Sequence, residues 1–92
     1  MLHTIQSVTD YLQHLQDKGF HFKEDALGFI EFGKHYTGAE DKLVIAAIEL
    51  TLKAQKEFDG AFFVSLLERL TKEKARNRSQ ALRVARELNI LN

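Results

Sequence analysis

Apolar side chains recur every three or four residues along most of this chain, which is the spacing of one face of an α-helix. Proline is absent, so long helices can run without interruption. The pattern predicts helices over residues 7–18, 24–36 and 38–58. The pattern also predicts a fourth and a fifth helix. They are expected to begin after Asp59 and Asn77, whose side chains are of the type that caps a helix start.

The third predicted helix, residues 38–58, is apolar around most of its circumference. Thr37 and Glu40 have the spacing of a capping box in front of it. A helix this apolar has to be covered by neighbours on several sides, so we expect it to be the buried centre of the domain. The narrow strip left for water consists of Ala46, Glu49, Lys53 and Lys56.

The second predicted helix contains two glycines, Gly28 and Gly33, each of which costs about 1 kcal/mol relative to alanine inside a helix. Glycines at such positions allow a neighbouring helix to approach closely. Ser7 is expected to cap the first helix. Together these elements predict an all-α fold, a compact five-helix domain with orthogonal or bundle-like packing, in which residues 1–92 form a single domain.

Ninety-two residues, 45% of them hydrophobic and 28% charged, suit one globular domain. Cysteine is absent, which excludes disulfides, thiolate catalysis and cysteine-based zinc sites and fits a reducing compartment. No apolar run approaches the roughly 20 residues that cross a bilayer. The first residues, MLHTIQSVTDYL, lack the basic and apolar regions of a secretory signal. We therefore expect a cytoplasmic protein without membrane contact.

Few residue combinations point to catalysis or to a metal site. Glu31 with His35, and His21 with Glu24, are the closest approaches to a ligand pair, but a metal needs three or four converging ligands. None of the serines lies in a Gly-x-Ser-x-Gly turn, and the glycines are scattered singly rather than gathered in a phosphate-binding loop. We expect no catalytic residue, no metal and no cofactor, and hence a protein that is not an enzyme.

Charge is divided unevenly along the chain although its net value is zero. Residues 1–68 hold six basic and eleven acidic side chains, whereas residues 69–92 hold seven basic and two acidic ones. Such asymmetry favours a charged partner. The alternative is a solvated helix face, or one that complements the acidic first two-thirds of the same or a neighbouring molecule. The candidate strip for an acidic protein surface or for nucleic-acid phosphates consists of Arg69, Lys72, Lys74, Arg76, Arg78, Arg83 and Arg86.

The segment SQALRVARELNI resembles the first helix and turn of a helix-turn-helix. This resemblance implies DNA contact through a second helix that enters the major groove. That second helix would begin near Asn92, the last residue of the sequence. The resemblance therefore keeps nucleic-acid binding as an alternative function.

Aromatic residues are concentrated in one stretch, since five of the nine fall within residues 20–36. Such a cluster commonly fills a small core. Its alternative role is an apolar patch, formed by Phe29, Phe32 and Tyr36, for a partner's helix or a second copy of this chain. We expect a small regulatory module that binds another protein through this patch, through the basic residues 69–86, or through both. Nucleic-acid binding by the same basic residues is the alternative.

Overall fold

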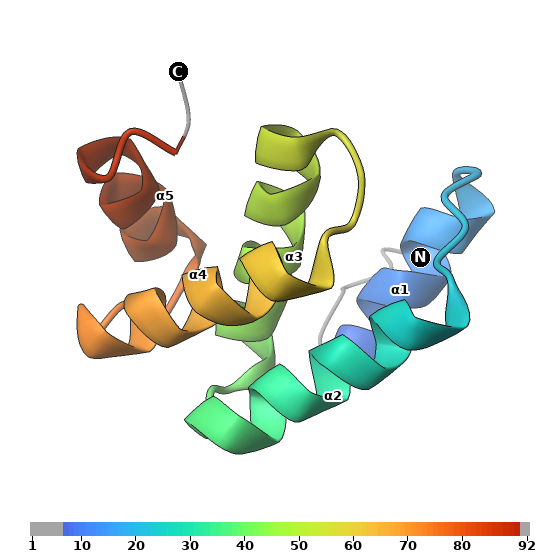
Figure 1. Ribbon diagram of the computed structural model, residues 1–92, viewed down its shortest axis with the longest axis horizontal. Coiled ribbons are helices and arrows are strands. Elements are labelled where there is room, and N and C mark those ends of the chain that lie inside the picture. Colours follow the sequence, from blue (N-terminus) through green and yellow to red (C-terminus); the bar gives the residue numbers. More distant parts are fainter. Residues whose placement is uncertain (1–6, 91–92) are drawn as a thin grey trace, which may run out of the picture.

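Five α-helices follow one another along the chain in the computed structural model, which describes residues 7–90 (Figure 1). All five helices expected from the apolar spacing are present, and the domain is all-α and compact, as predicted. The helices are α1 (Val8–Asp17), α2 (Glu24–Thr37), α3 (Asp41–Gln55), α4 (Gly60–Lys72) and α5 (Arg78–Glu87).

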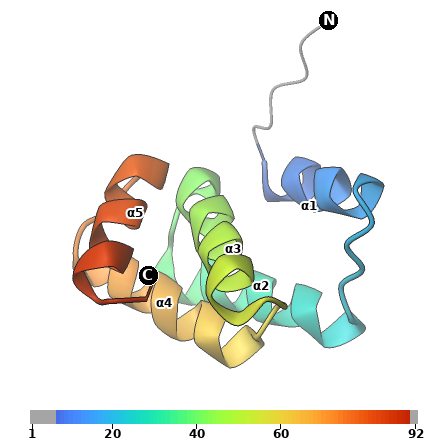
Figure 2. The same ribbon diagram turned by 90° about the horizontal axis from the view of Figure 1, so that it is seen from above.

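The third helix, α3, is the centre of the domain and contacts each of the other four helices. Figure 2 shows α1 and α5 on opposite sides of α3, with α2 and α4 running beneath it. Its side chains Val44, Ala47 and Ile48 have no exposed surface. Thr51 is also fully buried, and its hydroxyl donates a hydrogen bond to the Ala47 carbonyl oxygen at 2.7 Å. The prediction of a central buried helix is confirmed.

Side-chain caps fix the starts of α1, α4 and α5, as the sequence predicted. The side-chain oxygens of Ser7, Asp59 and Asn77 each accept a hydrogen bond from a backbone N–H three residues later, at distances of 2.9–3.1 Å. At the start of α5, Gln80 Oε1 in turn accepts from the backbone N–H of Arg76 at 2.8 Å. Together the two side chains satisfy the backbone N–H groups of Gln80 and Arg76, which would otherwise lack a partner at the start of the helix.

The helix α3 is shorter than predicted, since it covers Asp41–Gln55 rather than residues 38–58. The expected water-facing strip along it is also wrong at Ala46, which is 2% exposed. Glu49, one turn further along the same strip, binds Arg78 of α5. Because α5 lies against this side of α3, only the longer polar side chains of the strip reach solvent.

The capping box expected between Thr37 and Glu40 is wrong, because Thr37 is the last residue of α2. Its hydroxyl donates to the Gly33 carbonyl oxygen at 2.7 Å and accepts from the Ala39 N–H at 3.2 Å. Gly38 then adopts a left-handed conformation, with φ of 71°. Glycine ends helices in this way at little steric cost, so the chain turns before α3 begins.

Glycines lie at the contact between α2 and α4. A Cβ atom added at Gly33 would lie 2.9 Å from Cε2 of Phe63, and one added at Gly60 would fall against the ring of Phe29. Phe63 has no exposed surface, so its ring has no room to move aside. The expectation that a glycine admits a neighbouring helix is met at Gly33 but not at Gly28, where an added Cβ would meet nothing within 4 Å.

Asp41 joins three helices at the start of α3. One carboxylate oxygen accepts a hydrogen bond from the Val8 N–H of α1 at 2.9 Å, and the other lies 2.7 Å from Lys34 Nζ of α2. The hydrogen bond from Lys34, followed by that from Val8, holds the pKa of the Asp41 carboxyl below its ordinary value. The charged form of Asp41 therefore helps to fix the corner where α1, α2 and α3 meet.

Candidate interaction surfaces

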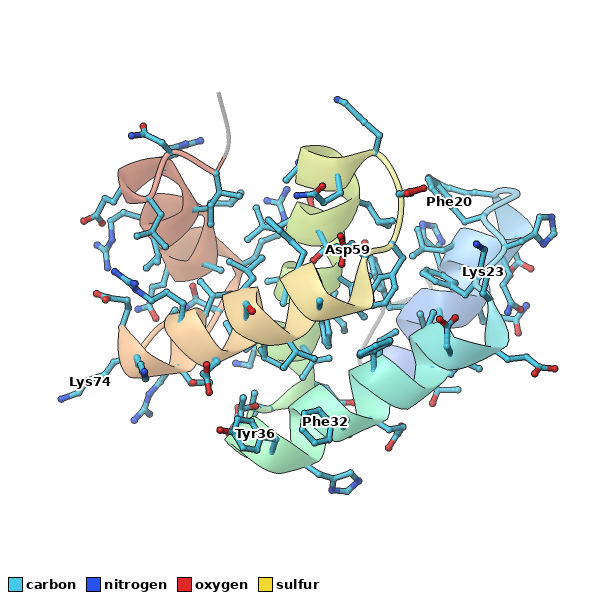
Figure 3. The ribbon with its side chains drawn as sticks, in the orientation of Figure 1. Phe20, Lys23, Phe32, Tyr36, Asp59 and Lys74 are labelled. Carbon is cyan, nitrogen blue, oxygen red and sulfur yellow. The ribbon has the colours of Figure 1, made fainter. Side chains whose placement is uncertain are left out.

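The outer side of α2 exposes three aromatic residues, Phe29, Phe32 and Tyr36, which we call the aromatic face. Their exposed fractions are 39%, 56% and 62%. The rings of Phe32 and Tyr36 are stacked, with centroids 5.4 Å apart and planes 11° from parallel. Figure 3 shows the two rings next to each other near the C-terminal end of α2. The two stacked rings form a flat apolar surface on this side of α2.

The helical spacing of α2 explains why these aromatic residues stay outside. The buried side of the helix is formed by Ala26, Ile30 and Gly33, three small or branched residues at intervals of four and three. Phe29 lies at the border of this side, with its ring over Gly60 of α4. The core contact of α2 is thus complete without Phe32 and Tyr36.

The other aromatic residues of the same sequence cluster lie elsewhere. Phe22 packs edge-on against Phe58, with centroids 5.7 Å apart, and Phe58 in turn contacts Phe63 in the core. Phe20 is 44% exposed in the connection between α1 and α2. The sequence cluster therefore divides into Phe22, which packs against the core, the exposed Phe20, and the aromatic face.

Arg78, one of the seven candidate basic residues, is occupied by an ion pair within the domain. Its Nε and Nη2 atoms donate to the two carboxylate oxygens of Glu49 on α3, both at 2.8 Å. Lys53 Nζ adds a contact to the same carboxylate at 3.1 Å. The Arg78 hydrogen bond is the main reason that the pKa of Glu49 lies below its ordinary value, and the pair raises the pKa of Arg78.

Arg69 is also paired locally, with its Nε atom 3.3 Å from Glu73 Oε2 one turn later. The other five basic residues are exposed, and no ion pair involves them within residues 7–90. Figure 3 shows Lys74 extending outward beyond the C-terminal end of α4. We call this set the basic edge; it consists of Lys72, Lys74, Arg76, Arg83 and Arg86.

The segment that resembles part of a helix-turn-helix forms α5 and the residues after it. The helix ends at Glu87, and Asn89 follows in a left-handed conformation with φ of 58°. The second helix that the resemblance implies would begin beyond Ile90, outside the described residues. The side chains of Arg83 and Arg86 lie on the exposed side of α5.

A groove of about 600 Å³ lies between the α2–α3 turn and the α4–α5 turn; we call it the turn groove. Glu40 and Lys42 line one side, and Lys74, Arg76 and Asn77 line the other. Lys42 was not among the residues singled out from the sequence, since it stands alone in an acidic segment. Only the fold places it across from Lys74 and Arg76.

Outside these surfaces, the described residues include a contact between a histidine and a carboxylate and a partly buried tyrosine with a raised pKa. His35 Nε2 lies 3.5 Å from Glu31 Oε2 on the exposed side of α2. Within residues 7–90, no three histidine, aspartate or glutamate side chains are grouped so that they could hold a metal ion. Burial, followed by the charge of Glu49, raises the pKa of Tyr11 to about 12. None of the helices described here has the length and apolar character needed to cross a membrane.

Comparison with known proteins adds a family but no function. Over residues 3–91 the sequence matches a family described as "Family of unknown function (DUF6123)". No curated protein and no solved structure matches the chain significantly. Its function is therefore inferred from the geometry of its surfaces.

Proposed function

The chain belongs to the DUF6123 family, and from its surface we propose that it is a small, non-enzymatic, cytoplasmic regulatory module that binds a partner protein through the aromatic face. The observation that carries this proposal is the stacked pair of Phe32 and Tyr36, each more than half exposed on a helix whose core contact is complete without them. Large exposed apolar groups lower the free energy when a partner covers them.

The aromatic face has the properties of an interface anchor. Aromatic side chains supply a large contact area while few torsion angles have to be fixed. The stacking of Phe32 on Tyr36 restrains these torsions further before binding. Phe29, seated over Gly60, extends the apolar surface to α4. A partner that presents an apolar helix or patch would bury all three rings at a modest cost in entropy.

Charge around the aromatic face suggests how the partner would be oriented. Asp25 lies four residues before Phe29 and hence on the same side of α2. The basic edge lies on the last two helices, α4 and α5, and on the turn between them. A partner with a basic group near Asp25 and acidic groups near the basic edge would be steered into one orientation, with a faster association rate.

The nucleic-acid alternative has less support from the surface. Two of the seven basic residues, Arg69 and Arg78, are engaged with Glu73 and Glu49 rather than available to phosphates. A titration of DNA and RNA followed by fluorescence anisotropy tests this alternative. We expect no binding at moderate salt; binding that falls steeply as salt rises, as phosphate contacts require, would favour the alternative.

The proposed function is tested by photo-crosslinking in the native host. A photoreactive phenylalanine analogue is placed at Phe32 or, as a matched control, at the exposed residue Gln16 of α1. We expect one protein to be crosslinked from position 32 and not from position 16. A second copy of this chain is a distinguishable outcome, since it gives a dimer of known mass.

Reconstitution with the purified crosslinked protein completes the test. Replacing an aromatic anchor at the centre of an interface costs about 2 kcal/mol or more, which is about thirtyfold in the dissociation constant. The Phe32→Ser variant should therefore bind at least this much more weakly. Equal crosslinking from both positions, or unchanged affinity of the variant, would contradict the proposal.

A further inference from the structure

The turn groove has a chemistry different from that of the aromatic face. Its lining contains three cationic side chains, Lys42, Lys74 and Arg76, against a single carboxylate, Glu40. The fold adds Lys42, from the acidic part of the chain, to Lys74 and Arg76 from the basic segment 69–92. A groove bordered by cations attracts anions because the low-dielectric walls concentrate the field.

Asn77 and Gln80, at the start of α5, add neutral hydrogen-bond donors to the same groove. The side-chain oxygens of Asn77 and Gln80 are already used, since they accept from the backbone N–H groups of Gln80 and Arg76. Their NH₂ groups can only donate, and both residues line the groove with the three cations. The side-chain groups of the groove that remain available are thus mostly donors, which suits a ligand composed mostly of acceptor oxygens.

From this arrangement we propose that the turn groove binds a small phosphate-bearing ligand. A phosphate group offers three or more acceptor oxygens with concentrated negative charge, and Arg and Lys are its usual protein partners. The volume of about 600 Å³ lies within the range of about 300–1,000 Å³ that is usual for small-molecule sites. No aromatic side chain is among the lining residues of the groove, so it offers no aromatic ring to stack on a nucleobase.

The backbone conformation of Lys74 makes a clean test available. Lys74 follows the end of α4 with φ of 62°, in the left-handed region that favours glycine. Lys56 has the same conformation at the end of α3, with φ of 66°, but does not line the groove. Replacing either lysine by glycine relieves the same backbone strain and removes one cation. The two variants therefore differ only in whether the lost cation lined the groove.

The test is a titration of the ¹⁵N-labelled protein with sodium pyrophosphate, followed by amide chemical shifts and compared with sodium chloride at matched ionic strength. We expect saturable shifts at millimolar pyrophosphate, confined to residues 37–43 and 71–80. Lys74→Gly and Lys42→Ala should each weaken binding about tenfold, since a charge-assisted hydrogen bond is lost. Lys56→Gly should bind as the unchanged protein does, and both glycine variants should have raised melting temperatures.

Four results would overturn the proposal. Absent shifts would mean that pyrophosphate does not bind in the groove. Shifts that spread over Arg83 and Arg86 and match those in chloride would mean that the anion is only attracted to positive charge in general. Equal weakening by Lys56→Gly and Lys74→Gly would mean the same. Binding of a glutamate-rich peptide in the groove without binding of pyrophosphate would assign the site to an acidic polypeptide. A Phe32→Ser variant should still bind pyrophosphate, so this test is independent of the partner-binding proposal.

Discussion

At the scale of the residue, Arg78 illustrates what the sequence leaves open. Its charge and its place among other basic residues made it a candidate for contact with an external partner, beside the alternative of a helix face that complements the acidic part of the same molecule. In the structure its guanidinium binds both oxygens of Glu49, twenty-nine positions earlier in the chain. Residue type identifies a cation, but only the packing of α5 on α3 decides that this one is structural. Lys42 is the converse case: it is isolated among acidic residues in the sequence, but the fold places it in the turn groove.

The Glu49 carboxyl should make stability depend on pH. Its pKa is lowered in the folded protein, mainly by the hydrogen bond from Arg78. The folded state therefore binds fewer protons than the unfolded state near pH 4. The stabilisation is complete above the ordinary carboxyl pKa and is lost as pH falls through the lowered pKa. Asp41, whose pKa is lowered by Lys34 first, contributes in the same direction.

Urea unfolding of Glu49→Gln between about pH 3 and pH 6 measures this contribution. The free energy of unfolding of the unchanged protein should fall more steeply on acidification than that of the variant, because the variant has no carboxyl to protonate at position 49. Identical pH profiles would mean that the ion pair with Arg78 does not form in solution.

At the scale of the element, the second helix shows what the apolar spacing predicts and what it leaves open. The apolar spacing predicted a helix over residues 24–36, and the structure has Glu24–Thr37. The same spacing did not decide whether Phe29 and Tyr36 fill the core. Their burial depends on how closely α4 approaches α2, and Gly33 allows that approach. Which side chains of a helix are buried is thus decided by the helices packed against it.

Two glycine substitutions within α2 should have opposite effects. Gly33→Ala adds a methyl group against the buried ring of Phe63, and overpacking of this kind costs about 1–3 kcal/mol. Even after the gain of about 1 kcal/mol in helix propensity, we expect a lower stability. Gly28→Ala has the same gain with open space around the methyl group, so it should raise stability by about 0.5–1 kcal/mol.

Thermal or urea unfolding of the two variants provides this comparison directly. Because both changes are Gly→Ala in one helix, propensity cancels between them and the difference reports the packing of α2 on α4. A Gly33→Ala variant as stable as Gly28→Ala would show that α4 does not approach α2 as closely as the structure has it.

At the scale of the whole molecule, the sequence predicted the fold class, the number of helices and the central position of α3. These features follow from short-range spacing and from the total apolar content of one segment. The capping box at Thr37 was wrong because a glycine in a left-handed conformation competes with a cap for the same turn. The burial of Ala46 and the turn groove depend on contacts between segments distant along the chain, which spacing alone does not encode.

The central claim is that the buried centre on α3 provides stability and leaves the aromatic face for binding. The most direct measurement is the free energy of unfolding of the double variant Phe32→Ser/Tyr36→Ser, beside that of Phe63→Ala. We predict a change below about 1 kcal/mol for the double variant, as for surface positions, and a loss of about 3–5 kcal/mol for the core variant. A double variant as destabilised as Phe63→Ala would contradict the account, because Phe32 and Tyr36 would then be part of the core.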